Sequence, residues 1–358
     1  MTRIKIISNV DIYRDPNRCV NQVSLATLEN GDIVAVFNEE RGRVHADNGW
    51  SSLIRSKDGG RTWDPSTKVT VLGCTEYTSN WDPAITRLSD GTLIVALNQR
   101  FRAREGRISF WYNWIGTYVL KSTDGGYTWS DPIPVNVHPM KHGGTRTGPL
   151  ELPNGRLLLG LYGRLTDYEE YGGYEARRAY LVKSDDKGDT WEHFSTLAYD
   201  PAGIIYYQEP ALVRLDNGTL VCMLRAEKAP SFTHDALYVT YSDDDGASWS
   251  LPKRLKIWGY PPHLLKLNDG RILLTYGYRR DEGGVKGLIS EDGYTWDPSQ
   301  IFTITTGGNA STNCDGMGGW HIGYPSTVQL EDGTILTAYH QYDQNNLQYI
   351  RATLYEIE

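Results

Sequence analysis

The chain has 358 residues, of which 39% are hydrophobic, and its 44 acidic residues outnumber its 36 basic ones, for a formal net charge of −8. This charge argues against a nucleic-acid-binding surface, but it leaves room for a local basic pocket for an acidic ligand. No apolar stretch approaches the length of a membrane span, and the N-terminal segment lacks the apolar run of a signal peptide. We therefore expect no membrane partner and a cytoplasmic protein; it would be secreted if a leader had already been removed.

Metal and cofactor patterns are missing from the sequence. The four cysteines form no CxxC pair, and the eight histidines show no HxxxH spacing. Closely spaced thiols and imidazoles are the usual sequence signature of a zinc site. The sequence therefore predicts neither a metal nor a cofactor.

A hairpin pattern, Leu-x-Asp/Asn-Gly followed by an apolar run, occurs six times along the chain. The first copy is LENGDIVAV and the last is LEDGTILTA. An Asp-Gly or Asn-Gly turn between apolar runs predicts a β-hairpin, and a continuously apolar strand is typical of burial on both faces. The glycines of the six turns are Gly31, Gly91, Gly155, Gly218, Gly270 and Gly333.

A second pattern, Ser-x-Asp-x-Gly-x-x-Trp, follows five of these hairpins. Its copies are SKDGGRTW, STDGGYTW, SDDKGDTW, SDDDGASW and a shortened SEDGYTW. In each copy the Asp and Gly favour a tight turn, and the Trp packs between strands. Two repeats that run through the whole chain indicate one array of similar units. The predicted fold is an all-β, six-bladed β-propeller of four-stranded antiparallel blades, a single domain over residues 1–358, in which the N-terminal strand IKIISNV closes the last blade.

Two positions in each unit are predicted to face the central axis, because the innermost strand of each blade lines the funnel of a propeller. Their residues differ from blade to blade and are mostly polar, which indicates ligand contacts rather than a repeated structural role. Nine positions before each glycine the chain has Gln22, Asp82, Arg146, Glu209, Pro261 and Tyr324. Seven positions after each glycine it has Asn38, Asn98, Tyr162, Arg225, Gly277 and His340.

The Ser-x-Asp-x-Gly-x-x-Trp cassette resembles the Asp-box of the sialidase-like (neuraminidase, BNR repeat) β-propellers, and the resemblance extends to four further segments. QEPALVRLDNGTLVCMLR is similar to the sialidase segment that carries a Glu and an Arg, here Glu209 and Arg225. GYPSTVQLEDG resembles the context of the nucleophilic Tyr, here Tyr324. HADNGWSSLIRS offers Asp47 as the acid/base, and GYRRDEGG offers Arg279 or Arg280 as a carboxylate-binding arginine.

This resemblance implies a retaining, exo-acting glycoside hydrolase with an oligosaccharide or polysaccharide substrate that ends in an acidic sugar. Tyr324 would be the nucleophile and Glu209 its base, since sialidases depart from the two-carboxylate scheme of most glycosidases. Asp47 would protonate the leaving oxygen, and Arg225 with Arg279 would hold the substrate carboxylate.

The first blade departs from the sialidase pattern, which begins its inner strand with a carboxylate-binding Arg. This chain has CVNQVSLATLENG there, with Asn21 and Gln22 in place of that Arg. Arg146 could supply a cation from another blade, with a different geometry. Sialic acid and a related sugar therefore both remain candidate substrates.

Two other functions fit the same funnel. One is a polysaccharide lyase that cleaves next to a uronic acid, with Tyr324 or His321 removing the C5 proton. The other is a carbohydrate-binding propeller without catalysis. Asp82, Tyr162 and His340 are further candidate substrate contacts by their register, although an Asp82–Arg146 ion pair is an alternative. The sequence gives no indication of the oligomeric state.

Overall fold

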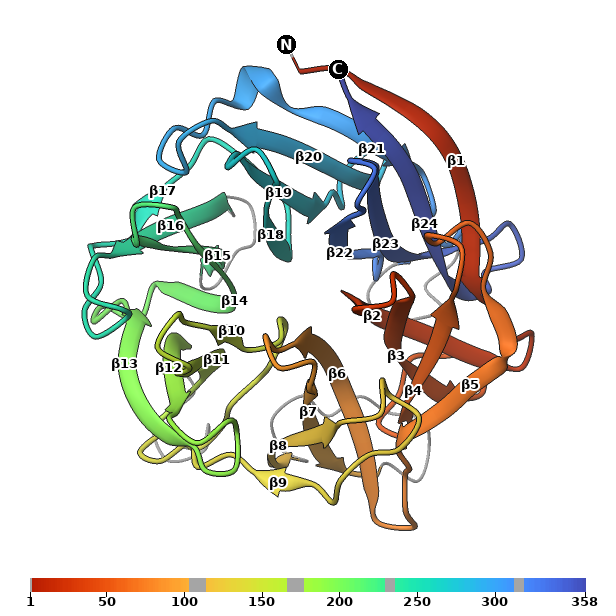
Figure 1. The fold of residues 1–358 in the computed structure, drawn as a ribbon, viewed down its shortest axis with the longest axis horizontal. Helices are drawn as coiled ribbons and strands as arrows, with labels where there is room; N and C mark the ends of the chain where they lie inside the picture. The colour runs from red at the N-terminus through yellow and green to blue at the C-terminus, as the bar shows by residue number, and fades with distance from the viewer. Residues whose placement is uncertain (1, 103–113, 166–176, 229–235, 312–318) are drawn as a thin grey trace.

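The computed structural model describes residues 2–102, 114–165, 177–228, 236–311 and 319–358. Its strands form six four-stranded antiparallel sheets that radiate from a central axis (Figure 1). The predicted all-β, six-bladed propeller is therefore confirmed.

The first three blades follow one another along the chain. Blade one contains β2 (Arg18–Thr27), β3 (Ile33–Arg41), β4 (Trp50–Ser56) and β5 (Asp64–Leu72). Blade two contains β6 (Thr78–Arg87), β7 (Leu93–Phe101), β8 (Trp114–Ser122) and β9 (Ile133–Pro134). Blade three contains β10 (Leu150–Glu151), β11 (Leu157–Gly163), β12 (Arg178–Ser184) and β13 (Glu192–Ala198).

The remaining blades complete the ring. Blade four contains β14 (Ile205–Arg214), β15 (Leu220–Lys228), β16 (Ala236–Ser242) and β17 (Lys253–Arg254). Blade five contains β18 (Pro262–Lys266), β19 (Ile272–Gly277), β20 (Gly284–Ser290) and β21 (Phe302–Thr306), with the short 3₁₀ helix η3 (Pro298–Gln300) before β21. Blade six contains β22 (Gly323–Gln329), β23 (Ile335–Tyr342), β24 (Gln348–Ile357) and β1 (Ile4–Tyr13).

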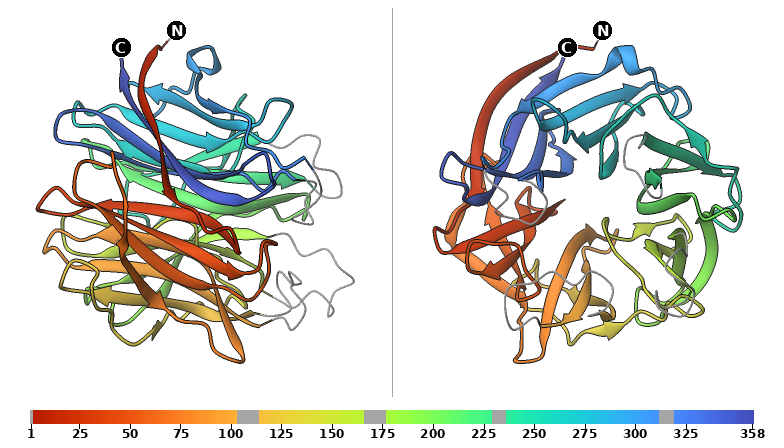
Figure 2. Two further views of the ribbon diagram at one scale, coloured as in Figure 1. Left: turned by 90° about the vertical axis from the view of Figure 1, so that its right-hand side faces the viewer. Right: turned by 180° about the vertical axis from the view of Figure 1, so that it is seen from behind.

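Blade six is built from both ends of the chain. β1 pairs antiparallel with β24, from Ile4 opposite Ile357 to Tyr13 opposite Ile350. The two termini therefore lie side by side at the outer rim of the ring (Figures 1 and 2). Within the described ranges, no helix is long and apolar enough to cross a membrane.

The hydrophobic core lies between neighbouring blades rather than in one central mass. Between blades six and one, for example, Phe37 and Ile54 cluster with Leu336 and Leu354, all fully buried. Similar clusters join the other blades. The buried apolar strands after each hairpin turn thus hold the blades together and leave the axis to polar residues.

The five repeated Ser-x-Asp turns close on themselves. In the first, Ser56 Oγ donates to Asp58 Oδ1 at 2.8 Å, the Gly60 amide donates to Ser56 Oγ at 2.9 Å, and Trp63 Nε1 donates to the Gly60 carbonyl at 3.2 Å. Because its polar groups are satisfied locally, such a turn needs no ligand.

Candidate functional site

The inner strands of four blades carry the same backbone irregularity at the same register. Gln22, Asp82, Glu209 and Tyr324 adopt positive φ values of 55°, 52°, 49° and 52°. In each case the pairing with the next strand shifts register at that point. Non-glycine residues in this conformation cost about 1–3 kcal/mol each and cluster at functional sites. A β-bulge also redirects its side chain, which makes these positions candidates for presenting groups at the axis.

Tyr324 and Glu209 meet across the axis from blades six and four. Tyr324 Oη donates to Glu209 Oε1 at 3.2 Å, and both side chains are buried. Burial and the neighbouring Glu209 raise the pKa of Tyr324 to about 12, against the opposing charges of Arg279 and Arg225. The phenol is therefore protonated at neutral pH, and Glu209 is positioned to accept its proton.

The approach of two glycine backbones next to Tyr324 fixes this arrangement. Gly323 has a φ of 90°, and a Cβ added to it would lie 2.7 Å from the Gly277 Cα. Side chains at this crossing of β19 and β22 would force the strands apart. Glycine at both positions therefore lets blades five and six converge where Tyr324 enters the site.

Arg225 is paired with two glutamates. Its Nη1 donates to Glu209 Oε2 at 3.1 Å, and its Nη2 donates to Glu227 Oε1. Although burial opposes it, the pair of carboxylates raises the pKa of Arg225 well above its ordinary value. In this structure the guanidinium bonds the Glu209 carboxylate that also contacts Tyr324, whereas the resemblance assigned Arg225 to a substrate carboxylate.

Two further arginines lie over the Tyr324 ring. The guanidinium carbons of Arg279 and Arg146 are each 4.9 Å from its centroid. Arg279 Nε donates to the Ile322 carbonyl at 2.9 Å, whereas its Nη2 is buried with no hydrogen-bond partner. Arg280 instead stacks on Trp258, 4.0 Å from the ring centroid. Of the two neighbouring arginines, Arg279 is thus the one next to Tyr324.

Arg146 does not pair with Asp82. It precedes the two-residue strand β10, and its Nη2 donates to the Pro325 carbonyl at 3.1 Å. Within the part of the chain that the structure describes, no ion pair joins it to Asp82. The alternative Asp82–Arg146 salt bridge is therefore not formed, and Arg146 brings a third guanidinium, with Arg225 and Arg279, to the surroundings of Tyr324.

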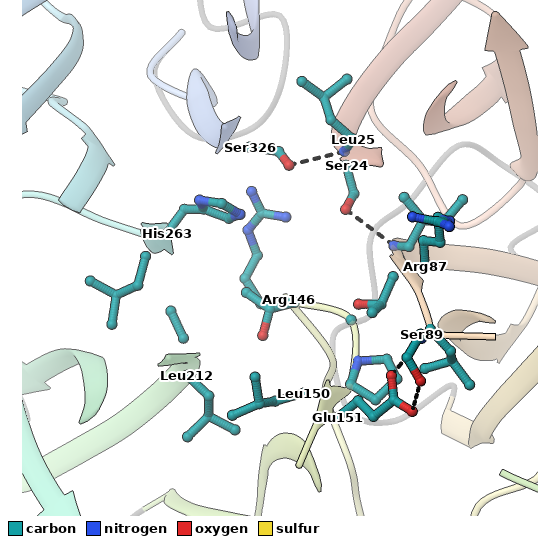
Figure 3. Close-up of a pocket in the computed structure, with 18 residues that line it drawn as sticks. Ser24, Leu25, Arg87, Ser89, Arg146, Leu150, Glu151, Leu212, His263 and Ser326 are labelled. Atoms are coloured by element: carbon teal, nitrogen blue, oxygen red, sulfur yellow. Dashed lines mark hydrogen bonds between the residues drawn. The ribbon is translucent and has the colours of Figure 1, made fainter. Parts of the chain in front are cut away.

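Arg146 also lines a cavity on the axis that is separate from the Tyr324–Glu209 contact. The cavity has a volume of 480 Å³, and neither Tyr324 nor Glu209 lines it. In Figure 3 the Arg146 side chain extends into it between His263 and Ser24. The side chain of Arg146 thus lies between this cavity and the Tyr324 ring.

Asp82 and Asp47 differ in their surroundings. Burial raises the pKa of Asp82 to about 6, although Arg100 opposes the shift. Asp47 is fully buried, and its Oδ1 lies 3.6 Å from Arg100 Nη1. Arg100 also stacks on Trp81, 3.9 Å from the ring centroid. Asp47, which the resemblance assigned as the acid/base, is thus a fully buried carboxylate beside a buried arginine.

Asn21 stands at the centre of a buried polar cluster in blade one. Its Nδ2 lies 3.3 Å from Glu40 Oε1 and from His45 Nδ1, and 3.4 Å from Cys19 Sγ and Gln348 Oε1. The ligand atoms of Cys19, Glu40 and His45 lie within 4.8 Å of one another, which makes them the candidate metal ligands among the described residues. The Asn21 Nδ2 atom lies within 3.4 Å of a polar atom of each of these three residues, in the place that a metal ion would need. The three residues therefore suit a hydrogen-bonded cluster better than a metal site.

His45 and two further histidines extend this cluster toward Tyr324. His45 Nδ1 lies 2.7 Å from Glu40 Oε1, and its ring stacks on His321 with centroids 4.4 Å apart. The His321 and His340 rings lie 5.4 and 5.2 Å from the Tyr324 ring. Burial lowers the pKa of both His321 and His340 well below the ordinary value, which keeps them neutral. Sequence reasoning missed Glu40 and His45 because they lie outside the repeated register.

The remaining sequence candidates also lie near the axis. Gln22 links two blades, because its backbone amide donates to His340 Nδ1 at 3.0 Å and its Oε1 accepts from the Asp82 amide at 3.1 Å. Burial raises the pKa of Tyr162 well above its ordinary value, with Asp82 and Glu209 adding to the shift. Gln22 is thus a structural link, whereas Tyr162 lies within electrostatic range of both carboxylates.

Replacing Asp82 with asparagine is expected to stabilise the protein in a pH-dependent way. The unfolded chain releases this proton near pH 3.8, but the native state holds it until about pH 6. The native state thus binds more protons across this window, and stability falls as pH rises through it. At 1.36 kcal/mol per pH unit, Asp82→Asn removes a cost of roughly 3 kcal/mol at pH 7.5.

Denaturant unfolding of both proteins at pH 4 and pH 7.5 measures this gain. It should be large at pH 7.5 and small at pH 4, whereas the exposed control Asp131→Asn should show neither. An equal gain at both pH values would contradict a raised pKa for Asp82.

Residues 74–337 match the family model described as BNR repeat-like domain. No protein with a curated description matches the chain. Among solved structures, a Dyadobacter fermentans protein of unknown function is 25% identical over 99% of both chains, with a TM-score of 0.84. The Hadza microbial sialidase Hz136 is 18% identical, with a TM-score of 0.71, over 94% of this chain and 65% of its own.

An α-L-arabinanase from Penicillium chrysogenum, solved with arabinobiose, is 15% identical over 98% of both chains, with a TM-score of 0.67. At these identities the sialidase and the arabinanase show a shared fold. Because the family model spans more than half of the sequence, the chain belongs to the BNR repeat-like domain family.

Proposed function

We propose that the protein is a retaining, exo-acting glycoside hydrolase that removes a terminal acidic sugar, either sialic acid or a related sugar. The observation that carries this proposal is the buried Tyr324–Glu209 contact of 3.2 Å, with Arg225 on the far oxygen of Glu209. The shared fold with a sialidase and an arabinanase supports a glycan as substrate.

The contact suits nucleophilic attack by a neutral phenol. Tyr324 is a poor nucleophile while protonated, and Glu209 lies within reach of its proton. As the Tyr324 oxygen bonds to the anomeric carbon, its proton moves to Glu209, and the leaving oxygen takes a proton from a second carboxyl group. Water then attacks the glycosyl–tyrosine bond, which gives retention after two displacements.

The arginines around Tyr324 suit an acidic substrate. Arg225 is paired with two glutamates, Glu209 and Glu227. Arg279 and Arg146 are therefore the arginines that would bind the substrate carboxylate. Arg279 supports this role with a buried Nη2 that has no partner in the described structure. A guanidinium that faces a substrate carboxylate gains a charge-assisted hydrogen bond.

The Asn21 cluster, whose members Cys19, Asn21, Glu40, His45 and Gln348 include no arginine, bears on which acidic sugar is bound. It fills the place in blade one where the sialidase pattern has an arginine, and its hydrogen bonds are directed to neighbouring protein groups. A substrate carboxylate would then contact the cations of blades three and five rather than those of blade one. This geometry favours an acidic sugar that is related to sialic acid but differs from it.

A substrate panel tests the proposal. The protein would be incubated with 4-methylumbelliferyl N-acetylneuraminic acid and with 4-nitrophenyl uronides and arabinofuranosides, and product anomers would be followed by NMR. We expect release of one acidic sugar with retained configuration. An unsaturated product that absorbs in the near ultraviolet would instead indicate a lyase, and binding without turnover a carbohydrate-binding propeller; either result contradicts the proposal.

A further inference from the structure

We propose that Asp82, rather than Asp47, is the catalytic residue that gives a proton to the leaving oxygen and later takes one from water. This inference rests on the proposed hydrolase function. It follows from where the fold places the two carboxyl groups.

Asp82 occupies the same presenting position as the nucleophile and its base. It lies at the bulge of β6, as Glu209 does on β14 and Tyr324 on β22, so the three groups come from alternate blades at one level of the axis. Their exposed fractions are small but not zero, at 6%, 3% and 8%. Each is therefore almost completely buried but keeps a small area in contact with solvent.

The backbone of Asp82 is held from both neighbouring blades. Its amide donates to Gln22 Oε1 at 3.1 Å, and its carbonyl accepts from Thr145 Oγ1 at 2.9 Å. A left-handed conformation persists when its surroundings determine it in this way. The carboxyl group is thus presented by a rigid strand, which suits proton transfer along a fixed direction.

Four charged or titratable groups, from four different segments of the chain, act on the Asp82 carboxyl group. Arg100 on β7, Arg146 before β10 and His45 between β3 and β4 favour the carboxylate, whereas burial and Glu209 on β14 oppose it. The outcome is a pKa of about 6. A group that titrates near the working pH can serve as acid in one step and as base in the next.

Asp47 does not occupy an inner-strand bulge. Its side chain is fully buried, its backbone lies between β3 and β4 rather than at an inner-strand bulge, and its Oδ1 is 3.6 Å from Arg100 Nη1. Arg100 in turn acts on Asp82 as its strongest favourable charge. Asp47 is therefore a positioning residue that acts through Arg100.

With Asp82 in this role, every proton is accounted for over the two chemical steps. In the first, the Asp82 carboxyl proton moves to the glycosidic oxygen as the bond from carbon to that oxygen breaks, and Tyr324 bonds to carbon while its proton moves to Glu209. In the second, water bonds to carbon and gives a proton to the Asp82 carboxylate. The bond from carbon to Tyr324 breaks, and Glu209 returns the tyrosine proton.

A comparison of Asp82→Asn with Asp47→Asn tests the assignment, using whichever aryl glycoside the wild type cleaves and an alkyl glycoside of the same sugar. A proton donor matters most for the poor alkyl leaving group, so Asp82→Asn should reduce kcat/KM about 10²–10⁴-fold for it and far less for the aryl glycoside.

Two further measurements test the base role and the titration of Asp82. Azide should restore turnover of the aryl glycoside by Asp82→Asn and yield a glycosyl azide, because azide needs no base. The fall of wild-type kcat/KM above about pH 6 should disappear in Asp82→Asn and shift in Asp47→Asn.

The outcomes separate the two proposals. If Asp47→Asn shows the azide rescue and the leaving-group dependence while Asp82→Asn keeps the fall above pH 6, the assignment to Asp82 is wrong and the hydrolase function stands. If the wild type cleaves no glycoside, the proposed function itself fails. Asp82→Glu, which keeps a carboxyl group, should retain part of the alkyl activity, so a loss confined to Asp82→Asn is assigned to the missing proton donor.

Discussion

Replacing Tyr324 with phenylalanine is expected to reduce kcat for glycoside cleavage on the order of 10⁴-fold or more, with little change in KM. The substitution removes only the hydroxyl group that reaches Glu209, and it keeps the ring that Arg279 and Arg146 both approach. Ground-state binding of the substrate should therefore survive while the proposed nucleophile is lost. Steady-state kinetics measure the effect, and a thermal midpoint close to that of the wild type would show that the fold is intact.

Two companion variants sharpen this test. Glu209→Gln should lose about 10²–10⁴-fold in kcat, since it removes the base. Combining it with Tyr324→Phe should add little, because residues that act as a unit are not additive. Tyr127 is an exposed tyrosine in the second Ser-x-Asp turn, and Tyr127→Phe serves as the matched control. More than a tenth of the wild-type kcat in Tyr324→Phe would exclude a tyrosine nucleophile.

Replacing Arg225 with methionine is expected to destabilise the protein by about 3–5 kcal/mol, whatever its substrate. The substitution leaves Glu209 and Glu227 buried without the guanidinium that pairs with both. Although burial opposes it, Arg225 lowers the pKa of Glu227, so its loss should let that carboxyl group take up a proton more readily. Denaturant unfolding at neutral pH measures the change.

Further variants identify the cause of this loss. Arg280→Met removes a neighbouring arginine that stacks on Trp258, and it should cost less than about 1 kcal/mol. Adding Glu227→Gln to Arg225→Met should recover part of the loss, because one unpaired charge is removed. If Arg225→Met were as stable as Arg280→Met, Arg225 would be free for a ligand and the pairing described above would not hold.

The blade architecture could be predicted from the sequence because it follows from local chemistry. Each Asp-Gly or Asn-Gly turn fixes a hairpin, and the apolar run after it identifies a buried strand. The same register placed Glu209 and Tyr324 on the inner strands of blades four and six. The resemblance to sialidases then paired them, and their side chains do meet. In a repeat fold, residues at equivalent positions of successive units lie at equivalent places around the axis.

The bulges and the pairing of Arg225 with Glu227 could not be predicted in the same way. A positive φ at Asp82 or Glu209 depends on how neighbouring strands meet, which no single residue specifies. A signal for the pair was nonetheless present, since Arg225 and Glu227 are two positions apart and so lie on one face of a strand. The cluster of Glu40 and His45 is not periodic, so only the folded chain brings it beside His321 and Tyr324.

The pairing of β1 with β24 has a mechanical consequence. A force applied to the two termini loads the ladder that joins Ile4 to Ile357, at the rim of blade six. That blade should open before the other five, and it is the one that carries Tyr324 on β22. Stretching a single molecule from its ends should therefore separate Tyr324 from Glu209 early, while most of the ring is still folded.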